Sequence, residues 1–322
     1  MSAAPMNSYK NQKAIWAGIF LVALALPAFI YPVVLMNVLV FMLFACAFNL
    51  MLGFGGLLSF GHAAFFGSAA YVTGHAAKEW GLTFELAVAC GVLVALALGW
   101  IFALIAVRSK GIYFAMITLA LSQMIYYIAL QAPFTGGEDG IQSIPRPPVF
   151  GVIDVSSNLA LFYTILVIFV IAMLALVRIS QSAFGQSLKA IRDNEDRAIS
   201  LGYDVVKYKQ MAFVISAGFS GIAGSLKVFV FSIATLTDVS WLLSGEVVLM
   251  ALLGGLGIIW APALGALIVV AMQYLLAPYG AWVTILQGLI FMSCVLLFRE
   301  GILGMIRDLL NRRRAKPSTS PN

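Results

Sequence analysis

The sequence predicts an all-α, polytopic integral membrane protein with about ten (roughly eight to ten) transmembrane helices and with both termini in the cytoplasm. Of its 322 residues, 62% are hydrophobic and only 10% are charged, whereas a soluble domain averages about 45–50% apolar and about 25% charged residues. The apolar residues form runs long enough to cross a bilayer, and the basic residues gather on one side of these runs. An ordinary soluble enzyme is therefore excluded first.

Ten stretches of the chain are apolar over about the length that a spanning helix needs. The polar start of the chain is not typical of a cleavable signal peptide, so we expect the first stretch to remain as a membrane helix. The eighth and ninth stretches are short and separated only by Trp260 and Ala261, so either could be a re-entrant or broken helix. The ten stretches cover residues 14–30, 33–52, 57–77, 84–107, 111–131, 158–177, 210–235, 243–259, 262–277 and 281–298.

The distribution of positive charge orients these stretches in the membrane. If the N-terminus is cytoplasmic, 16 of the 19 Lys and Arg residues fall in the inner segments 1–13, 108–110, 178–209 and 299–322. Cytoplasmic loops of membrane proteins carry such an excess of Lys and Arg. The net charge of +6 therefore reflects topology. Nucleic-acid binding is not expected, because no basic patch is interleaved with aromatic residues.

The same pattern divides the chain into a transmembrane domain and two tails. Residues 1–13 form a cytoplasmic N-terminal tail, residues 14–298 the transmembrane domain, and residues 299–322 a basic cytoplasmic tail. Two hydrophilic loops interrupt the domain. Residues 132–157 are rich in Pro and Gly and are expected outside, and residues 178–209 are densely charged and are expected inside.

No motif of a soluble or metal-dependent enzyme occurs in the sequence. The patterns GxxxxGK[ST], GxSxG and HExxH are absent, so we expect no cofactor, no metal and no ATP hydrolysis by this chain. The three cysteines lie in apolar stretches and are interpreted as small buried hydrophobes. A catalytic site assembled from distant helices remains an alternative, and it would have to use Ser59, His62 or Glu246.

Polar residues within the apolar stretches are candidates for a translocation pathway, because they are costly inside a membrane. Coupled carriers generally need several buried carboxylates, and only Glu246 is available, which disfavours an autonomous secondary carrier or channel. Lys227 either binds a substrate carboxylate or, as the favoured interpretation, snorkels near the outer boundary. The candidate pathway residues are Ser59, His62, Gln123, Lys227 and Glu246.

Small residues and glycine turns indicate how the helices pack. Pairs such as Ser220 and Gly224 stand four positions apart, a spacing that lets helices approach closely in lipid. The triplets Gly55-Gly56-Leu57 and Gly254-Gly255-Leu256 each end a stretch that runs inward. They are compatible with a duplicated architecture, although the similarity is short.

The inner loop 178–209 has the signals of a short helix. Asp193 or Asn194 can cap its start, with Glu195 in the first turn, where an acidic side chain is favourable. Gly202 suits the position that ends the helix, and Asp204 can cap the next membrane helix. This helix of about two turns is either part of a solvated basic loop or a docking element for a cytoplasmic partner.

Several long blocks of the chain, in the same order, resemble the permease subunits of branched-chain amino acid ABC importers, specifically the LivM type. The resemblance extends from about Leu50 to Gly304. The blocks are GFGGLLSFGHAAFFGSAAY (53–71), RSKGIYFAMITLALSQ (108–123), TGGEDGI (135–141), SAFGQSLKAIRDNEDRAISLGY (182–203), SGEVVLMALLGGLG (244–257) and APALGA (261–266).

This resemblance implies a multi-pass permease of the bacterial inner membrane that works with other subunits. The partners would be a second, LivH-like permease, two cytoplasmic ATPase subunits, a periplasmic substrate-binding protein and membrane lipid. The cargo would be leucine, isoleucine and valine. Related systems carry urea, short amides or aromatic carboxylates, so these substrates form the alternative.

The resemblance also assigns roles to both hydrophilic loops. The outer loop would face the binding protein through Gly136, Gly137, Glu138 and Asp139. The inner loop would couple the permease to the ATPase subunits. Its expected contact residues are Gly185, Ser187, Ala190, Asp193, Asn194, Glu195, Ala198 and Gly202.

Overall fold

The computed structural model describes residues 26–280 together with residues 285, 286, 288, 289 and 292. Within this part of the chain, helices are joined by turns and loops, and none of the named elements is a β-strand. Five helices are long and apolar enough to cross a membrane, and two more are apolar but shorter. The prediction of an all-α, polytopic membrane protein is confirmed.

The predicted crossings agree best with the structure in the middle of the chain. Helices α4 (Phe84–Ala106) and α5 (Ile112–Gln131) begin and end within one residue of their predicted limits. Helix α6 (Asn158–Gln181) starts at the predicted residue and extends about one turn further. The predicted crossings 14–30 and 281–298 lie mostly outside the described residues, so they and the placement of the termini stay predictions.

The start of α3 differs from its prediction. Helix α2 (Pro32–Asn49) continues into a π-helical turn, Leu50–Phe54, but α3 (His62–Lys78) begins five residues later than expected. The segment between them is apolar yet not helical. Gly56 has φ +68°, a left-handed conformation that glycine adopts without strain and that ends the preceding helical turn.

Two other boundaries were also predicted wrongly. Helix α9 (Val205–Phe231) begins five residues earlier than predicted, because its first turn is capped by Asp204 and carries lysines that lower the local hydropathy. Helix α10 (Trp241–Gly254) ends five residues before its predicted limit, where Gly255 takes φ +113°. Helix α11 (Ala261–Leu276) follows a short non-helical connection, so the expected break between the two short helices is present.

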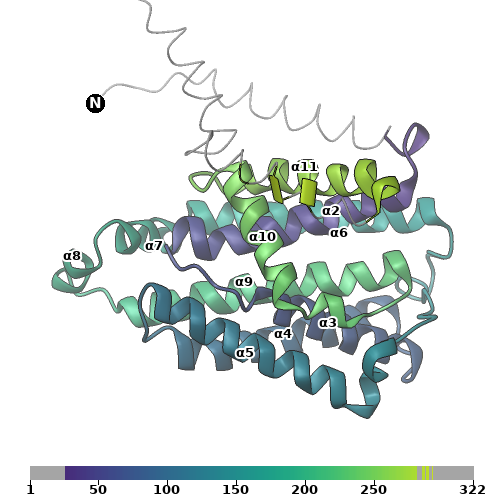
Figure 1. The fold of residues 1–322 in the computed structure, drawn as a ribbon, viewed down its shortest axis with the longest axis horizontal. Helices are drawn as coiled ribbons and strands as arrows, with labels where there is room; N and C mark the ends of the chain where they lie inside the picture. Colours follow the sequence, from purple (N-terminus) through teal and green to yellow (C-terminus); the bar gives the residue numbers. More distant parts are fainter. Residues whose placement is uncertain (1–25, 281–284, 287, 290–291, 293–322) are drawn as a thin grey trace, which may run out of the picture.

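The inner loop contains two helices rather than one. Helix α7 (Ala183–Asp193) precedes the predicted short helix, which is α8 (Glu195–Ser200). Figure 1 shows both at one end of the bundle, with α8 projecting from it. The outer loop precedes α6 and the inner loop follows it, so a helix of 24 residues, about 36 Å long, separates them.

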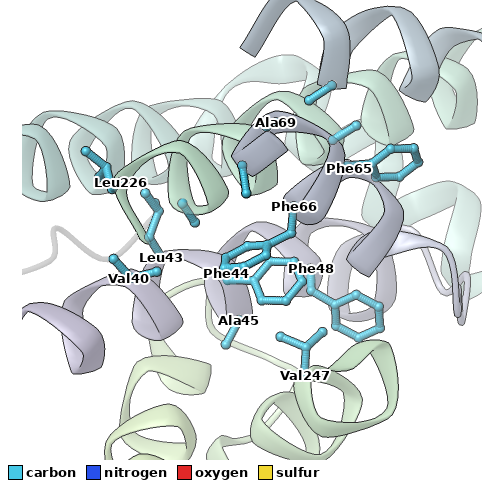
Figure 2. Packing of buried hydrophobic residues seen from close by; sticks show 14 of the residues in the cluster. Val40, Leu43, Phe44, Ala45, Phe48, Phe65, Phe66, Ala69, Leu226 and Val247 are labelled. Carbon is cyan, nitrogen blue, oxygen red and sulfur yellow. The ribbon is translucent and has the colours of Figure 1, made fainter. Parts of the chain in front are cut away.

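Helix α9 lies at the centre of the bundle and packs against α2, α3 and α4. In Figure 2, aromatic rings of α2 and α3 meet beside α9 and α10. Rings of Phe44 and Phe66 lie 4.7 Å apart between centroids. The labelled residues of this cluster are Val40, Leu43, Phe44, Ala45, Phe48, Phe65, Phe66, Ala69, Leu226 and Val247.

Candidate functional site

Helix α7 forms because a serine caps it and a glycine allows a tight turn after α6. The Ser182 hydroxyl accepts a hydrogen bond from the Gly185 amide at 3.4 Å. A Cβ on Gly185 would lie 2.3 Å from the Ser180 carbonyl oxygen, so no larger residue fits this turn. Leu188 and Ile191 are buried on one face of α7. Sequence reasoning missed α7, although the serine cap and this apolar spacing were available signals.

The predicted caps of the following elements are confirmed. The Asn194 side-chain oxygen accepts from the Arg197 amide at 2.9 Å and starts α8, so the cap is Asn194 and not Asp193. Gly202 has φ +86° just beyond α8, as expected for the residue that ends a helix. The Asp204 carboxylate then accepts from the Lys207 amide at 3.2 Å and starts α9.

The eight expected contact residues of the inner loop divide into an exposed and a sheltered set. Ala190, Asp193, Asn194 and Gly202 are exposed, and Ser187 is half-buried. The exposed residues are therefore the ones that a partner protein could reach directly. The sheltered residues are Gly185 and Ala198, which are buried, and Glu195, which is half-buried and held by ion pairs.

Glu195 joins α8 to two other elements through ion pairs. Its Oε2 lies 3.0 Å from Lys209 Nζ in α9, and its Oε1 lies 3.2 Å from Lys110 Nζ in the turn before α5. The Lys209 side chain is only 7% exposed, so its charge is largely removed from water. Burial acts to raise the pKa of Glu195, but hydrogen bonds and charge from Lys209 and Lys110 outweigh it and lower that pKa overall.

Large apolar side chains beside α8 are exposed and were not predicted as contacts. Ile199, Leu201 and Tyr203 are 53%, 69% and 40% exposed. Ile199 belongs to α8, which projects from one end of the bundle (Figure 1), and Leu201 and Tyr203 flank the exposed Gly202 just after α8. Exposed apolar side chains that form a patch mark a surface that a partner protein or a membrane covers.

His62 is the most enclosed of the candidate pathway residues. It is fully buried, and its ring lies 4.8, 5.6 and 5.8 Å from the rings of Phe48, Phe65 and Phe213. The Ser216 hydroxyl donates to the Ala47 carbonyl at 2.6 Å, so it accepts from His62 Nε2 at 2.8 Å. This arrangement fixes the His62 tautomer that carries its proton on Nε2.

Ser59 lies in the non-helical segment before α3 and also has a local role. Its hydroxyl is fully buried and accepts from the Gly61 amide at 3.1 Å. The Thr118 hydroxyl of α5 accepts from the neighbouring Phe60 amide at 3.1 Å. Side chains thus satisfy backbone donors of a segment that lacks helical hydrogen bonds, as a membrane interior requires. Gln123 lies half-buried further along α5.

Lys227 is paired with an acid that the sequence did not single out. Its Nζ lies 2.7 Å from Asp238 Oδ2, and the two side chains are 12% and 8% exposed. The same oxygen accepts from the amide and the hydroxyl of Thr235, each at 3.0 Å. Asp238 lies in a 3-10 turn, Leu236–Asp238, between α9 and α10. The Lys227 charge is therefore neutralised within the chain.

Glu246 contacts a different helix. Gln273 Nε2 in α11 lies 3.4 Å from each Glu246 carboxylate oxygen in α10. Among the hydrogen bonds of the described residues that involve the five candidate pathway residues, none joins two of the five. Ser59 and His62 are neighbours in sequence at the start of α3, and the remaining three residues lie on other helices.

The outer loop is fastened to the end of α9. Arg146 donates through Nε to the Phe229 carbonyl at 2.9 Å and through Nη2 to the Val230 carbonyl at 3.1 Å. These oxygens lie in the last turn of α9 and lack helical partners. Ile141 and Ala234 also exchange backbone hydrogen bonds at 3.0 and 2.9 Å.

The expected contacts for a binding protein lie at the start of this loop. Gly136 and Gly137 have φ +76° and +60°, and they shape a turn that only glycine adopts readily. Glu138 and Asp139 follow and are exposed. Within the described residues, no group of three or more His, Cys, Asp or Glu side chains could hold a metal ion.

Comparison with known proteins identifies the family of the chain. A family model described as the permease component of the branched-chain amino acid transport system matches residues 31–298. The chain belongs to this family. It is therefore a multi-pass membrane transport subunit and not a catalytic enzyme.

Three relatives have names that agree with this assignment. The permease is 25% identical to the high-affinity branched-chain amino acid transport system permease protein LivM of Escherichia coli K12, over 91% of this chain and 76% of that protein. It is also 25% identical to the Salmonella typhimurium LivM, over 84% and 69%. A probable LivM of Methanocaldococcus jannaschii is 28% identical over 60% and 56%. No solved structure matches the permease.

The family match covers both hydrophilic loops and all helices from α2 to α11. The capped segment α7–α8 and the outer loop fastened by Arg146 therefore both lie inside the region that defines the permease family. Residues 1–30 and 299–322 lie outside that region.

Proposed function

We propose that this permease is the membrane-spanning subunit of an ATP-driven importer in a bacterial inner membrane. It moves leucine, isoleucine and valine from a periplasmic binding protein into the cytoplasm. The observation that carries the proposal is the exposed, capped segment α7–α8 at one end of a bundle whose family is the branched-chain amino acid permeases. A second, LivH-like permease and two cytoplasmic ATPase subunits complete the importer.

The proposed topology places the two loops on opposite sides of the membrane. Residues 178–209 are cytoplasmic and contact the ATPase subunits, and residues 132–157 are periplasmic and contact the binding protein. The tails 1–13 and 299–322 are cytoplasmic. Support comes from the length of α6, which separates the loops, and from the excess of basic residues in the inner segments.

In the proposed mechanism, ATP binding to the partner subunits displaces α7 and α8. The exposed Ala190, Asp193, Asn194 and Gly202 contact the ATPase surface together with Ser187. The sheltered Gly185, Glu195 and Ala198 hold the two helices in position. This permease has no GxxxxGK[ST] motif, so hydrolysis takes place on the partner subunits.

A copurification experiment tests the cytoplasmic contact. Leu201 is 69% exposed beside α8, and Val152 is 85% exposed in the outer loop. Leu201→Asp should abolish copurification of the ATPase subunits and substrate-stimulated ATP hydrolysis, whereas Val152→Asp should leave copurification unchanged. Equal copurification of the two variants with their ATPase subunits would refute the docking role of α8.

Two further measurements test the cargo and the need for partners. Ligand binding by the cognate periplasmic protein decides between branched-chain amino acids and the alternatives, which are urea, short amides and aromatic carboxylates. Uptake by liposomes that contain only this permease would instead identify an autonomous secondary carrier or channel. We expect no uptake from such liposomes.

A further inference from the structure

The two glycine turns with similar sequences lie against each other at the inner end of the bundle. One is the turn after α2, residues 53–57, and the other is the turn after α10, residues 254–257. A Cβ on Gly53 would lie 2.4 Å from the Leu256 carbonyl oxygen, so the two backbones touch without an intervening side chain. We call this contact the glycine joint.

A buried amide side chain ties the two parts of the glycine joint together. Asn49 is fully buried in the last turn of α2, and its Nδ2 donates to the Ile258 carbonyl at 2.9 Å. The Asn49 Oδ1 atom would lie 2.1 Å from a Cβ on Gly53. The side chain thus fills the space that only a glycine leaves open.

Helix α7 is attached to the same place from the cytoplasmic side. Arg192 Nη1 donates to the Gly53 carbonyl, and a Cβ on Gly56 would lie 2.7 Å from Arg192 Cγ. One turn earlier in α7, Lys189 Nζ lies 4.5 Å from the centroid of the Phe54 ring. Gly53 therefore meets α7 through its carbonyl and the α10–α11 connection through its Cα.

The backbone of the glycine joint is distorted in both turns. The first turn overlaps a π-helical turn, Leu50–Phe54, a distortion that occurs frequently at functional sites. Gly56 and Gly255 have φ +68° and +113°, conformations that other residues rarely adopt. A displacement of α7 alone would break the hydrogen bond from Arg192 Nη1 to the Gly53 carbonyl.

Close packing continues from the glycine joint into α10 and α11. A Cβ on Gly254 would lie 2.2 Å from the Ala261 carbonyl oxygen, and one on Gly265 would lie 1.9 Å from the Met250 carbonyl oxygen. The glycines therefore let the backbones of α10 and α11 approach closely, and the two helices pack as a single hairpin. Helix α11 also packs on α2, so the hairpin follows any displacement of the inner end of α2.

We propose that Arg192 is a positioning residue that fastens α7 to the glycine joint. As a result, α7, the π-helical turn and the α10–α11 connection move as one body when the partner subunits bind ATP. This inference rests on the proposed function, because it needs an ATPase that displaces α7. It adds the route by which that displacement enters the membrane helices.

Distances between spin labels test this inference in the complete importer. Gln186 of α7, Gly257 of the glycine joint and Val152 of the outer loop are exposed, and each is changed to cysteine after alanine replaces the native cysteines. On ATP addition, the distance between labels at 186 and 257 should change by less than about 1 Å. The distance between labels at 186 and 152 should change by more than about 2 Å, the scale of helix shifts in switching proteins.

The outcomes separate this inference from the proposed function. If both distances change by similar amounts, α7 moves independently of the glycine joint and the inference is wrong, while the proposed function stands. If neither distance changes, ATP does not displace α7, and the proposed function fails together with the inference.

A substitution of Arg192 provides the second test. Arg192→Ala should reduce the substrate-stimulated rate of ATP hydrolysis at least tenfold, while the ATPase subunits still copurify. The distance between labels at 186 and 257 should now change on ATP addition. Arg108→Ala is the matched control and should leave the stimulation unchanged, because this arginine is exposed and lies outside α7 and the glycine joint. Unchanged stimulation in Arg192→Ala would overturn the role of Arg192.

Discussion

Lys209 Nζ lies 3.0 Å from Glu195 Oε2, so the first residue of α8 is bonded to the first turns of α9. Lys110 reaches the other oxygen of the same carboxylate from the turn before α5. The consecutive helices α8 and α9 and the distant turn before α5 therefore meet at one carboxylate. We conclude that the position of α8 depends on an internal ion-pair network as well as on its cap.

Glu195→Gln should loosen α8 without unfolding the bundle. The substitution keeps the shape of the side chain but leaves Lys209, which is 7% exposed, without its carboxylate partner. We expect a loss on the order of 1 kcal/mol in the local opening free energy of α8. Hydrogen exchange at the α8 amides should then accelerate about fivefold. Equal exchange in both proteins would show that the cap alone holds α8.

The same network gives α8 a pH dependence with a defined sign. Burial opposes ionisation of Glu195, but Lys209 and Lys110 lower its pKa in the folded protein below the ordinary value of about 4.3. The pair therefore contributes its stability above that ordinary pKa and loses it as the pH falls through the lowered pKa.

Hydrogen exchange can detect this pH dependence. The ratio of α8 exchange rates between Glu195→Gln and the native protein should be constant from about pH 5 upward. It should fall toward unity as the pH falls through the lowered pKa of the native carboxylate. A ratio that does not change over this range would contradict an ionised Glu195 in the network.

Asn194 is exposed and caps α8. Substitutions of this residue can distinguish its role as a cap from a direct contact with a partner protein. The side-chain oxygen accepts from the Arg197 amide, and Asp supplies an equivalent acceptor, whereas Ala supplies none. Asn194→Ala should cost about 1 kcal/mol of α8 stability and reduce transport, and Asn194→Asp should retain both. Uptake assays in proteoliposomes of the complete importer measure the effect. If Asn194→Asp loses transport while α8 exchange stays slow, the amide contacts a partner directly.

The ion pair of Lys227 and Asp238 predicts an asymmetric effect of substitutions. Both side chains are mostly buried, so Asp238→Ala leaves an unpaired buried ammonium group and should cost roughly 3–5 kcal/mol. Removal of both charges, by Lys227→Met with Asp238→Ala, should recover most of that loss. Thermal unfolding in detergent measures the stability of each variant.

Transport by the double variant then decides what the pair does. Recovered stability with normal uptake would show that Lys227 does not bind a substrate carboxylate. Recovered stability with lost uptake would place the pair in the translocation pathway. A double variant as unstable as Asp238→Ala would contradict the unpaired charge as the cause of the loss.

The features that the sequence predicts well depend on local chemistry. Helices α4 and α5 are uniformly apolar between turn residues, so their limits follow from hydropathy. The caps at Asn194 and Asp204 need only the residues of the next turn. By contrast, Leu57, Leu58 and Phe60 are apolar but not helical, because hydropathy reports burial and not backbone conformation.

Two of the features that the sequence missed depend on contacts between separate elements. Asp238 is eleven positions from Lys227 and lies in a separate turn, so no helical spacing connects them. Arg192 meets Gly53 across 139 positions. Helix α7 escaped prediction because it is amphipathic and charged, and so lies outside a search for apolar stretches. The sequence also could not tell which of the predicted contact residues of the inner loop are exposed, because exposure depends on the complete fold.

Small residues along α9 allow it to pack closely in the centre of the bundle. The expected close approach at the Ser220 and Gly224 spacing is confirmed, since a Cβ on Gly224 would lie 1.9 Å from the Phe66 carbonyl oxygen of α3. Gly224→Ala should therefore force α3 and α9 apart and cost about 1–3 kcal/mol or more. Gly245→Ala in α10 is the matched control, because no atom lies within 4 Å of its added Cβ. Thermal unfolding in detergent should show a lower midpoint for Gly224→Ala than for Gly245→Ala. Equal midpoints would show that α9 can move away from α3 without loss of stability, and they would contradict this prediction.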